Sequence, residues 1–287
     1  MIGNLANLQR LDIKLKRIIN TKNEYVTIKD KIVFVKDKTE NNWRVVIPGQ
    51  IANMITQETQ EIMGHLGRYK TYHALKRICI FKNMHKIVAS IVRNCDNCQK
   101  SKPINYQSSG PKKSHKPKTP FETVSIDLMG PLPTGRGGTH YILAILDTFS
   151  KYIRLYALKK ASAKAIINRL EQDYIPNTVK PQSILTDNGI QFTGKLWKTK
   201  LHELNIIIKH STKYHPQSNP VERYNREIGR LLRTYCCDQH TKWLNYLENI
   251  EDWMNKVRSE LTEMTPWKII KGEIPKQPLE DIIKFPE

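Results

Sequence analysis

Three acidic residues in the second half of the sequence have the type and placement needed to hold divalent cations. Asp127 lies near the end of an apolar stretch, Asp187 directly follows a second stretch, and Glu222 lies two residues after Pro220, in the first turn of an expected helix. Carboxylates are hard oxygen ligands that suit Mg²⁺ or Mn²⁺. Two such ions about 3.5–4 Å apart can activate an attacking oxygen and stabilise a leaving one in phosphodiester chemistry.

Each of these residues also has a purely structural explanation. Asp127 could end a strand in a turn, the sequence Thr-Asp-Asn-Gly around Asp187 favours a β-turn, and an acidic residue such as Glu222 stabilises a helix N-terminus. Asp147 and Glu203 lie in the same region and compete as ligands. Spacing alone therefore does not select the three carboxylates.

Cysteines offer a second candidate metal site. Cys95 and Cys98 are separated by two residues, a spacing that in a reducing compartment indicates metal binding or redox chemistry rather than a disulfide. The other three, Cys79, Cys236 and Cys237, have no partner at metal-binding spacing, and we expect them to be buried thiols. An odd total of five argues against a secreted disulfide scaffold.

The elements that must position the carboxylates alternate in type after residue 120. Apolar patterning predicts five strands and three helices. The expected strands cover 123–128, 141–146, 152–158, 183–186 and 206–209, and the expected helices cover 161–174, 195–204 and 220–236. Short connections make the first three strands antiparallel, whereas helical crossovers make the others parallel. The fold class is thus α/β, with a mixed five-stranded sheet and flanking helices.

Before residue 120 the sequence predicts a smaller, mainly helical region. A first helix carries apolar residues on one face, at Leu8, Leu11, Leu15 and Ile18. Short antiparallel strands are expected between residues 25 and 47, and helices from residue 50 to the cysteine pair. The segment 100–120 has four prolines, six lysines and no acidic residue, which indicates an extended basic linker. The expected divisions are 1–49, 50–99, 100–120, 121–238 and 239–287.

Charge identifies the class of partner. The chain has 47 Lys and Arg against 27 Asp and Glu, a net charge of +20, which favours a polyanionic partner and disfavours a hydrolase of simple acidic substrates. A hydrophobic content of 39% is too high for a disordered chain. No apolar run approaches the roughly 18 residues that span a bilayer, and no signal peptide is recognisable. We therefore expect a protein that stays inside the cell.

Four segments, in this order, resemble the catalytic core of gypsy-type LTR retrotransposon integrases. They are VSIDLMGPLP from Val124, YILAILDTFSKY from Tyr141, LTDNGIQF from Leu185 and YHPQSNPVERYN from Tyr214. The resemblance implies an RNase H-like fold in which Asp127, Asp187 and Glu222 bind two Mg²⁺ ions. It further implies that water trims the 3′ end of the element's DNA, and that the freed 3′-OH then attacks target DNA in the nucleus.

The cysteine pair, with His65 inside Met-Gly-His-Leu-Gly, resembles the His-His-Cys-Cys zinc domain that precedes such a core. The resemblance makes His65, Cys95 and Cys98 zinc ligands, but the nearest place for the first histidine holds Gln60. His73 lies eight residues beyond His65, about 12 Å along a helix, too far to share the ion. We therefore expect either that Glu58, Glu61 or water is the fourth donor, with zinc binding weaker than in an intact domain, or that the module is stabilised by its apolar core instead.

The resemblance also implies DNA contacts and assembly around DNA ends. Candidate DNA-binding residues lie in the linker, in the loop before Glu222 and on the helix after it: Lys112, Lys113, Lys116, Lys118, Lys213, Tyr214, His215, Gln217, Asn219, Arg223 and Arg226. The expected partners are DNA and further copies of the chain, with no small-molecule substrate and no membrane. Two alternatives remain open: a host-adopted DNA-binding protein without strand transfer, and a nuclease without joining activity. The chain could also be a fragment of a longer polyprotein.

Overall fold

The computed structural model describes residues 5–12, 24–37, 42–101, 117–211, 220–236 and 239–276. These residues fall into two compact units. The N-terminal unit contains the described residues up to Lys100 together with Pro275 and Lys276, and the core unit runs from Ser101 to Ile274. Each unit is described separately below.

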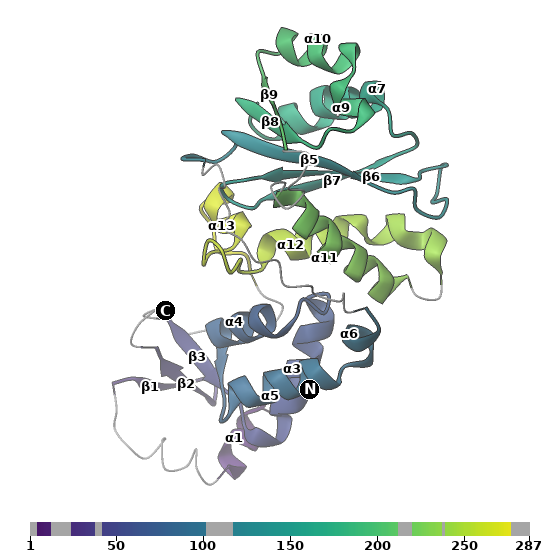
Figure 1. Cartoon of the computed structure of the whole chain (residues 1–287). Helices are drawn as coiled ribbons and strands as arrows, with labels where there is room; N and C mark the ends of the chain where they lie inside the picture. Colours follow the sequence, from purple (N-terminus) through teal and green to yellow (C-terminus); the bar gives the residue numbers. More distant parts are fainter. Residues whose placement is uncertain are drawn as a thin grey trace, which may run out of the picture. The chain divides into compact units, whose positions relative to one another are not determined.

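The N-terminal unit combines a small sheet with helices (Figure 1). The strands are β1 (Val26–Lys29), β2 (Ile32–Lys36), β3 (Trp43–Val46) and β4 (Cys79–Ile80), in the order β1-β2-β3-β4. The first three pair antiparallel, as predicted, and β4 adds a parallel pairing to β3. The helices are α1 (Leu5–Leu11), α3 (Gly49–Ile62), α4 (Arg68–Ile78), α5 (Met84–Asn94) and α6 (Asp96–Ser101). One apolar cluster joins sheet and helices through Phe34, Val45, Ile55, Leu75 and Val88.

Helix α1 packs with a different face from the predicted one. Leu11 is 69% exposed, whereas Leu5 and Gln9 are buried. The Gln9 amide donates to the carbonyls of Val33 and Val46 and accepts from the Val33 N–H. A buried glutamine is stable here because it satisfies backbone groups of the sheet, which an apolar pattern does not reveal. The expected positions Leu15 and Ile18 lie outside the described residues.

The core unit is built on the predicted five-stranded mixed sheet. Its strands are β5 (Thr123–Met129), β6 (Tyr141–Asp147), β7 (Ile153–Leu158), β8 (Ser183–Thr186) and β9 (Ile207–His210), in the order β7-β6-β5-β8-β9. Strands β5, β6 and β7 pair antiparallel, and β8 and β9 continue the sheet in parallel. The predicted strand types and directions are confirmed.

Helices cover both faces of this sheet (Figure 1). One side carries α7 (Ala163–Arg169), α8 (Ile175–Asn177), α9 (Ile190–Thr193) and α10 (Lys195–Glu203), and the other carries α11 (Pro220–Tyr235), α12 (Leu247–Lys256) and α13 (Pro266–Lys271). A π-helical segment, Leu170–Tyr174, joins α7 to α8, and a 3₁₀ helix, His240–Tyr246, precedes α12. The largest buried side chains of the first side include Trp197, Tyr174 and Phe192.

Helix α12 completes the edge strand β7. The Asn255 side chain accepts from the Ile153 N–H and donates to the Ile153 carbonyl, both at 2.8 Å, and Glu251 accepts from the Leu155 N–H. These side chains hydrogen-bond to backbone groups that an edge strand otherwise leaves exposed.

Among the described helices, none combines the length and apolar character needed to cross a membrane.

Candidate catalytic and metal-binding sites

Sheet register places Asp127 and Asp187 beside each other. Residues of β5 pair with residues of β8 at a constant offset of 60, from Thr123 with Ser183 to Ser125 with Leu185. Asp127 and Asp187 keep this offset, so Asp127 on β5 lies close to the level of Asp187, which directly follows the parallel strand β8. Strand alternation directs Val124 into the apolar core and Asp127 to the opposite face.

Helix α11 brings the third carboxylate to that face. It packs against β5 and β6, and Glu222 lies in its first turn. Asn225, one turn later on the same helix face, donates from Nδ2 to Asp127 Oδ2 at 2.8 Å. This bond joins α11 to β5 and fixes the side on which Glu222 stands.

The carboxylates repel one another. Burial is the largest cause of a rise in the pKa of Asp127 to about 6, and the charge of Asp187 adds to it, although hydrogen bonds from the Leu128 N–H and Asn225 oppose the rise. The pKa of Glu222 is raised by burial and then by the charge of Asp127, against an opposing effect of Arg226. A site whose acids resist ionisation in this way gains most from a bound cation.

The donor set fits hard cations. All three ligands are carboxylates, the hard oxygen donors that suit Mg²⁺ or Mn²⁺. Beside them, the buried Asn225 Oδ1 has no hydrogen-bond partner among the described residues, which leaves a fourth hard oxygen for an ion or its water.

The two competing carboxylates have structural roles. Asp147 is fully buried, and its oxygens accept from the backbone N–H groups of Phe121, Phe149 and Ser150. It therefore organises the turn after β6. Glu203 is exposed at the end of α10 and forms an ion pair with Lys200 at 3.0 Å.

The second candidate site lies in the N-terminal unit. His65, Cys95 and Cys98 form the group within 4.8 Å, with His65 Nδ1 at 3.3 Å from Cys95 Sγ and 3.8 Å from Cys98 Sγ. Tetrahedral zinc with these ligands requires nitrogen–sulfur separations of about 3.6 Å, between the two observed values. His65 has a left-handed backbone with φ 54°, which non-glycine residues rarely adopt. The three side chains therefore fit a zinc ion.

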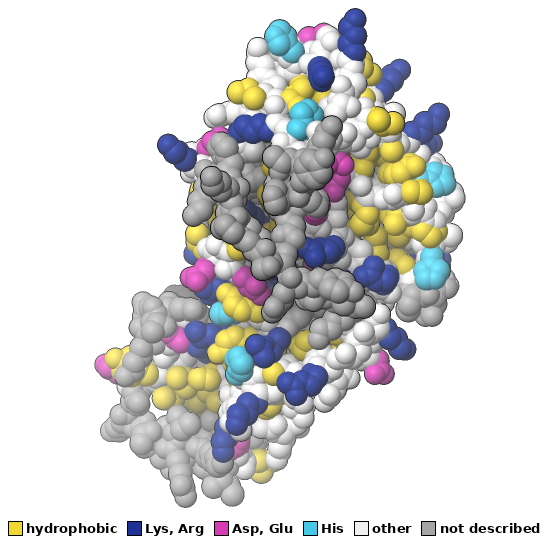
Figure 2. Space-filling view, in the orientation of Figure 1, with side chains coloured by type: hydrophobic (Ala, Val, Ile, Leu, Met, Phe, Trp, Pro, Cys, Tyr) yellow, Lys and Arg dark blue, Asp and Glu magenta, His cyan; other side chains and the backbone are white. Residues whose placement is uncertain are grey.

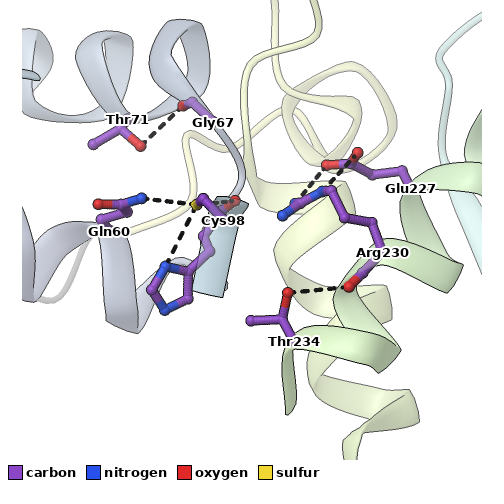
Figure 3. A network of polar contacts seen from close by, with 8 residues as sticks. Gln60, Gly67, Thr71, Cys98, Glu227, Arg230 and Thr234 are labelled. Atoms are coloured by element: carbon purple, nitrogen blue, oxygen red, sulfur yellow. Dashed lines mark hydrogen bonds and ion pairs between the residues drawn. The ribbon is translucent and has the colours of Figure 1, made fainter. Parts of the chain in front are cut away.

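Neither of the two glutamates suggested from the sequence stands at the fourth position. Gln60 is buried, and its Nε2 lies 3.1 Å from Cys98 Sγ (Figure 3). The suggestion that Glu58 or Glu61 completes the site is wrong, because both are exposed on α3 and neither belongs to the group. His73 is outside the group as predicted, and its ring contacts that of Tyr69 with centroids 4.2 Å apart.

The remaining described cysteines, Cys79 and Cys236, are buried thiols, as predicted. Burial raises the pKa of Cys79 to about 12, so this thiol is unreactive near neutral pH. Cys237 lies outside the described residues.

Few of the predicted DNA contacts fall on described residues. Arg223 and Arg226 are exposed on α11, and Arg223 forms a long ion pair with Glu260 at 3.7 Å. Lys118 is exposed. The others, Lys112, Lys113, Lys116, Lys213, Tyr214, His215, Gln217 and Asn219, lie outside the described residues. Figure 2 shows Lys and Arg side chains scattered over the visible face of both units.

Asn225 is the functional candidate that sequence reasoning missed. It belongs to the quoted YHPQSNPVERYN segment, but no role was assigned to it. The available signal was its spacing of three residues from Glu222 on an amphipathic helix, which puts both side chains on one face.

Comparisons with known proteins match two regions of the chain to families of known domains. Residues 47–104 match the family model described as integrase zinc binding domain, and residues 117–216 match the integrase core domain. The chain is 28% identical over 234 residues to the Pro-Pol polyprotein of feline foamy virus, and 27% identical over 270 residues to the transposon Tf2-3 polyprotein of Schizosaccharomyces pombe. These matches cover 81% and 90% of this chain, but only 20% of each relative.

A solved structure supports the fold. The chain is similar, at 17% sequence identity and a TM-score of 0.53, to a chain of a simian T-cell lymphotropic virus intasome in complex with PP2A regulatory subunit B56 gamma. The match covers 78% of this chain and 74% of that chain. The resemblance stated from the sequence motifs is confirmed. The chain thus contains a region that matches the integrase zinc binding domain, followed by a region that matches the integrase core domain.

Proposed function

We propose that the chain is a metal-dependent polynucleotidyl transferase that trims the 3′ end of an element's DNA and joins it to target DNA. The observation that carries this proposal is the convergence of Asp127, Asp187 and Glu222 on one face of the sheet, where burial and neighbouring carboxylates raise the pKa values of Asp127 and Glu222. Bound Mg²⁺ or Mn²⁺ ions would lower the pKa of the attacking oxygen and neutralise charge at phosphorus. No covalent enzyme intermediate is required.

The protein's own residues hold the geometry of the reaction. Asp127 is fixed by hydrogen bonds from the Leu128 N–H and from Asn225, both at 2.8 Å. Asp187 accepts from the Gly189 N–H at 2.9 Å, which orients its carboxylate after β8. Because these bonds are made within the protein, they hold both carboxylates in place for the phosphodiester.

We assign zinc to His65, Cys95 and Cys98 and propose that this domain supports assembly of several copies around DNA ends. The proposal follows the family's domain pair and the fit of the nitrogen–sulfur distances to tetrahedral zinc. The expected site of action is the nucleus.

A gel assay with labelled donor DNA ends and a target duplex tests the proposal. Joined products support it, cut products without joining indicate the nuclease alternative, and a shift without cutting indicates a DNA-binding protein. The active mixture should lose all products when the Mg²⁺ is removed, because phosphate binding by lysines cannot replace the cations.

The basic linker gives a test of DNA binding alone. Replacing Lys112, Lys113, Lys116 and Lys118 with Gln should flatten the plot of log binding constant against log salt, by about 0.9 for each lysine that neutralises a phosphate. Lys200→Gln is the control, because Glu171 and Glu203 already neutralise Lys200 in the fold. An unchanged slope in the quadruple variant means that the linker is only a tether.

A further inference from the structure

Gln60 occupies the place next to the sulfur cluster where a fourth ligand would stand. Its side chain comes from the last turn of α3, is 2% exposed, and points at Cys98 (Figure 3). The distance from Nε2 to Cys98 Sγ is 3.1 Å. The amide therefore contacts Cys98 on the buried side of the cluster.

The backbone holds Gln60 and His65 in a fixed relation. The His65 N–H donates to the Gln60 carbonyl at 2.8 Å, where the chain leaves α3. Gly64 and His65 then take left-handed conformations, with φ of 73° and 54°. This turn directs both side chains from the end of one helix toward the two cysteines.

The chemistry of the site requires a fourth donor. Zinc in a structural site is four-coordinate, and His65, Cys95 and Cys98 supply three ligands. An oxygen ligand would stand about 3.6 Å from each sulfur, so the Gln60 amide needs a shift of about half an ångström from its present place. The two ends of an amide are nearly the same shape, and a half-turn of the group presents Oε1 instead of Nε2.

We propose that Gln60 supplies Oε1 as the fourth ligand of a zinc ion held by His65, Cys95 and Cys98. This inference rests on the proposed zinc site and is independent of the chemistry proposed for the core unit. A neutral amide oxygen is a poorer donor to zinc than imidazole, so the site holds its ion less tightly than one with a second histidine. The chain thus has a complete but readily exchanged zinc site.

The test is the zinc dissociation constant of the full chain, measured by competition with a chromophoric chelator at pH 7.5. Gln60→Glu should bind zinc on the order of tenfold more tightly, because it keeps the size and replaces a neutral oxygen with a charged one. Gln60→His should also bind more tightly. Gln60→Leu, which has no donor atom, should bind on the order of tenfold more weakly.

The sign of the Gln60→Glu effect separates two roles of the amide. If Gln60 only donates an N–H to the Cys98 sulfur, the Glu variant loses that donor and places a negative charge beside a thiolate, so zinc binding weakens. That result overturns the proposal, as does a Gln60→Leu variant with the affinity of the wild type. Gln57→Glu is the matched control, since Gln57 is exposed on the same helix and the charge change should leave the affinity unchanged.

Failure of the zinc site itself gives a different result. If the wild type takes up no zinc, or if Cys95→Ser binds it equally well, both the zinc assignment and the role of Gln60 are wrong. Circular dichroism of each variant with zinc present shows whether the N-terminal unit is folded. If Gln60→Glu does not fold, the zinc affinity of Gln60→His tests the proposal in its place.

Discussion

The two candidate metal sites of this chain are built in opposite ways. In the N-terminal unit, the donor atoms of His65, Cys95 and Cys98 already stand at separations suited to one ion. In the core unit, Asp127 and Glu222 have raised pKa values because they are partly buried and lie near other carboxylates. The first site has ligand atoms that fit one ion, whereas the second carries a charge conflict that a bound cation or a proton relieves.

This difference follows from how each site is positioned. A helix end and a short Cys-x-x-Cys turn create the sulfur cluster, so its geometry is local. Strand register and the packing of α11 create the acidic site, so its geometry depends on the whole core unit. Loss of a metal should therefore affect local structure in the first case and the charge balance of a folded domain in the second.

The largest expected effect is on catalysis. Asp127→Asn, Asp187→Asn and Glu222→Gln should each lower metal-dependent cutting and joining on the order of 10³-fold or more, because an amide is a poor ligand for a hard cation. DNA binding should be nearly unchanged, since lysines and arginines supply the phosphate contacts. The gel assay and a binding titration measure the two properties separately.

Glu203→Gln is the matched control for this series. Glu203 is a carboxylate of the same unit that is exposed and paired with Lys200, so its variant should keep full activity. Full activity in any one of the three triad variants removes that residue from the mechanism.

A smaller effect separates the thiols of the N-terminal unit. With zinc removed, iodoacetamide at pH 8 should modify Cys95 at least about a hundredfold faster than Cys79, because Cys95 is half-buried and the pKa of Cys79 is raised to about 12. Added zinc should protect Cys95. Peptide mapping by mass spectrometry resolves each residue.

Protein unfolded in denaturant provides the reference for these rates, since both thiols should then react alike. Equal modification of Cys79 and Cys95 in the folded protein contradicts the buried position of Cys79. Modification of Cys95 at the same rate with and without zinc contradicts its assignment as a ligand.

The charge conflict in the core unit predicts a pH dependence of stability. The pKa of Asp127 is about 6 in the folded chain against a reference of 3.8, so the folded state holds this proton more tightly. The loss of stability caused by ionising Asp127 in the folded chain is absent below about pH 4. It grows as the pH rises from 4 to 6, and it is fully present above that range. Metal-free protein should therefore lose on the order of 1–2 kcal/mol of unfolding free energy from this residue across that window.

Asp127→Asn should remove this component, so that its denaturant unfolding curves change less between pH 4 and pH 6 than those of the wild type. If the side-chain amide of Asn225 rotates by half a turn, its Oδ1 faces residue 127 and can accept a hydrogen bond from the new asparagine. An equal loss of stability between pH 4 and pH 6 in wild type and variant would show that ionisation of Asp127 is not the cause of the loss.

Much of this arrangement could be predicted from the sequence. Apolar alternation predicted the strands of the core sheet, and the Cys-x-x-Cys spacing predicted the sulfur site. The selection of Asp127, Asp187 and Glu222 over Asp147 and Glu203 came from motif resemblance rather than from physics. The structure gives the physical reason, since Asp147 is consumed by backbone hydrogen bonds and Glu203 points to solvent.

Buried and half-buried polar side chains were the features that pattern analysis could not find. Gln9, Asn225 and Asn255 satisfy particular backbone or carboxylate groups on elements distant in sequence. Their partners depend on tertiary packing, and a polar residue on a helix otherwise predicts a solvent-exposed position. Gln60 was identified only as the place of a missing histidine, and its contact with Cys98 required the structure.

The most direct test of the central claim is a calorimetric titration of Mn²⁺ into zinc-loaded protein in buffers of different ionisation enthalpy. At pH 6 about half of the Asp127 carboxyl groups are protonated, so cation binding should release roughly half a proton from this residue. The release should fall toward zero at pH 8, and Asp127→Asn should bind Mn²⁺ much more weakly. Mn²⁺ binding of equal strength and equal proton release in wild type and Asp127→Asn would contradict the assignment of Asp127 to the cation site.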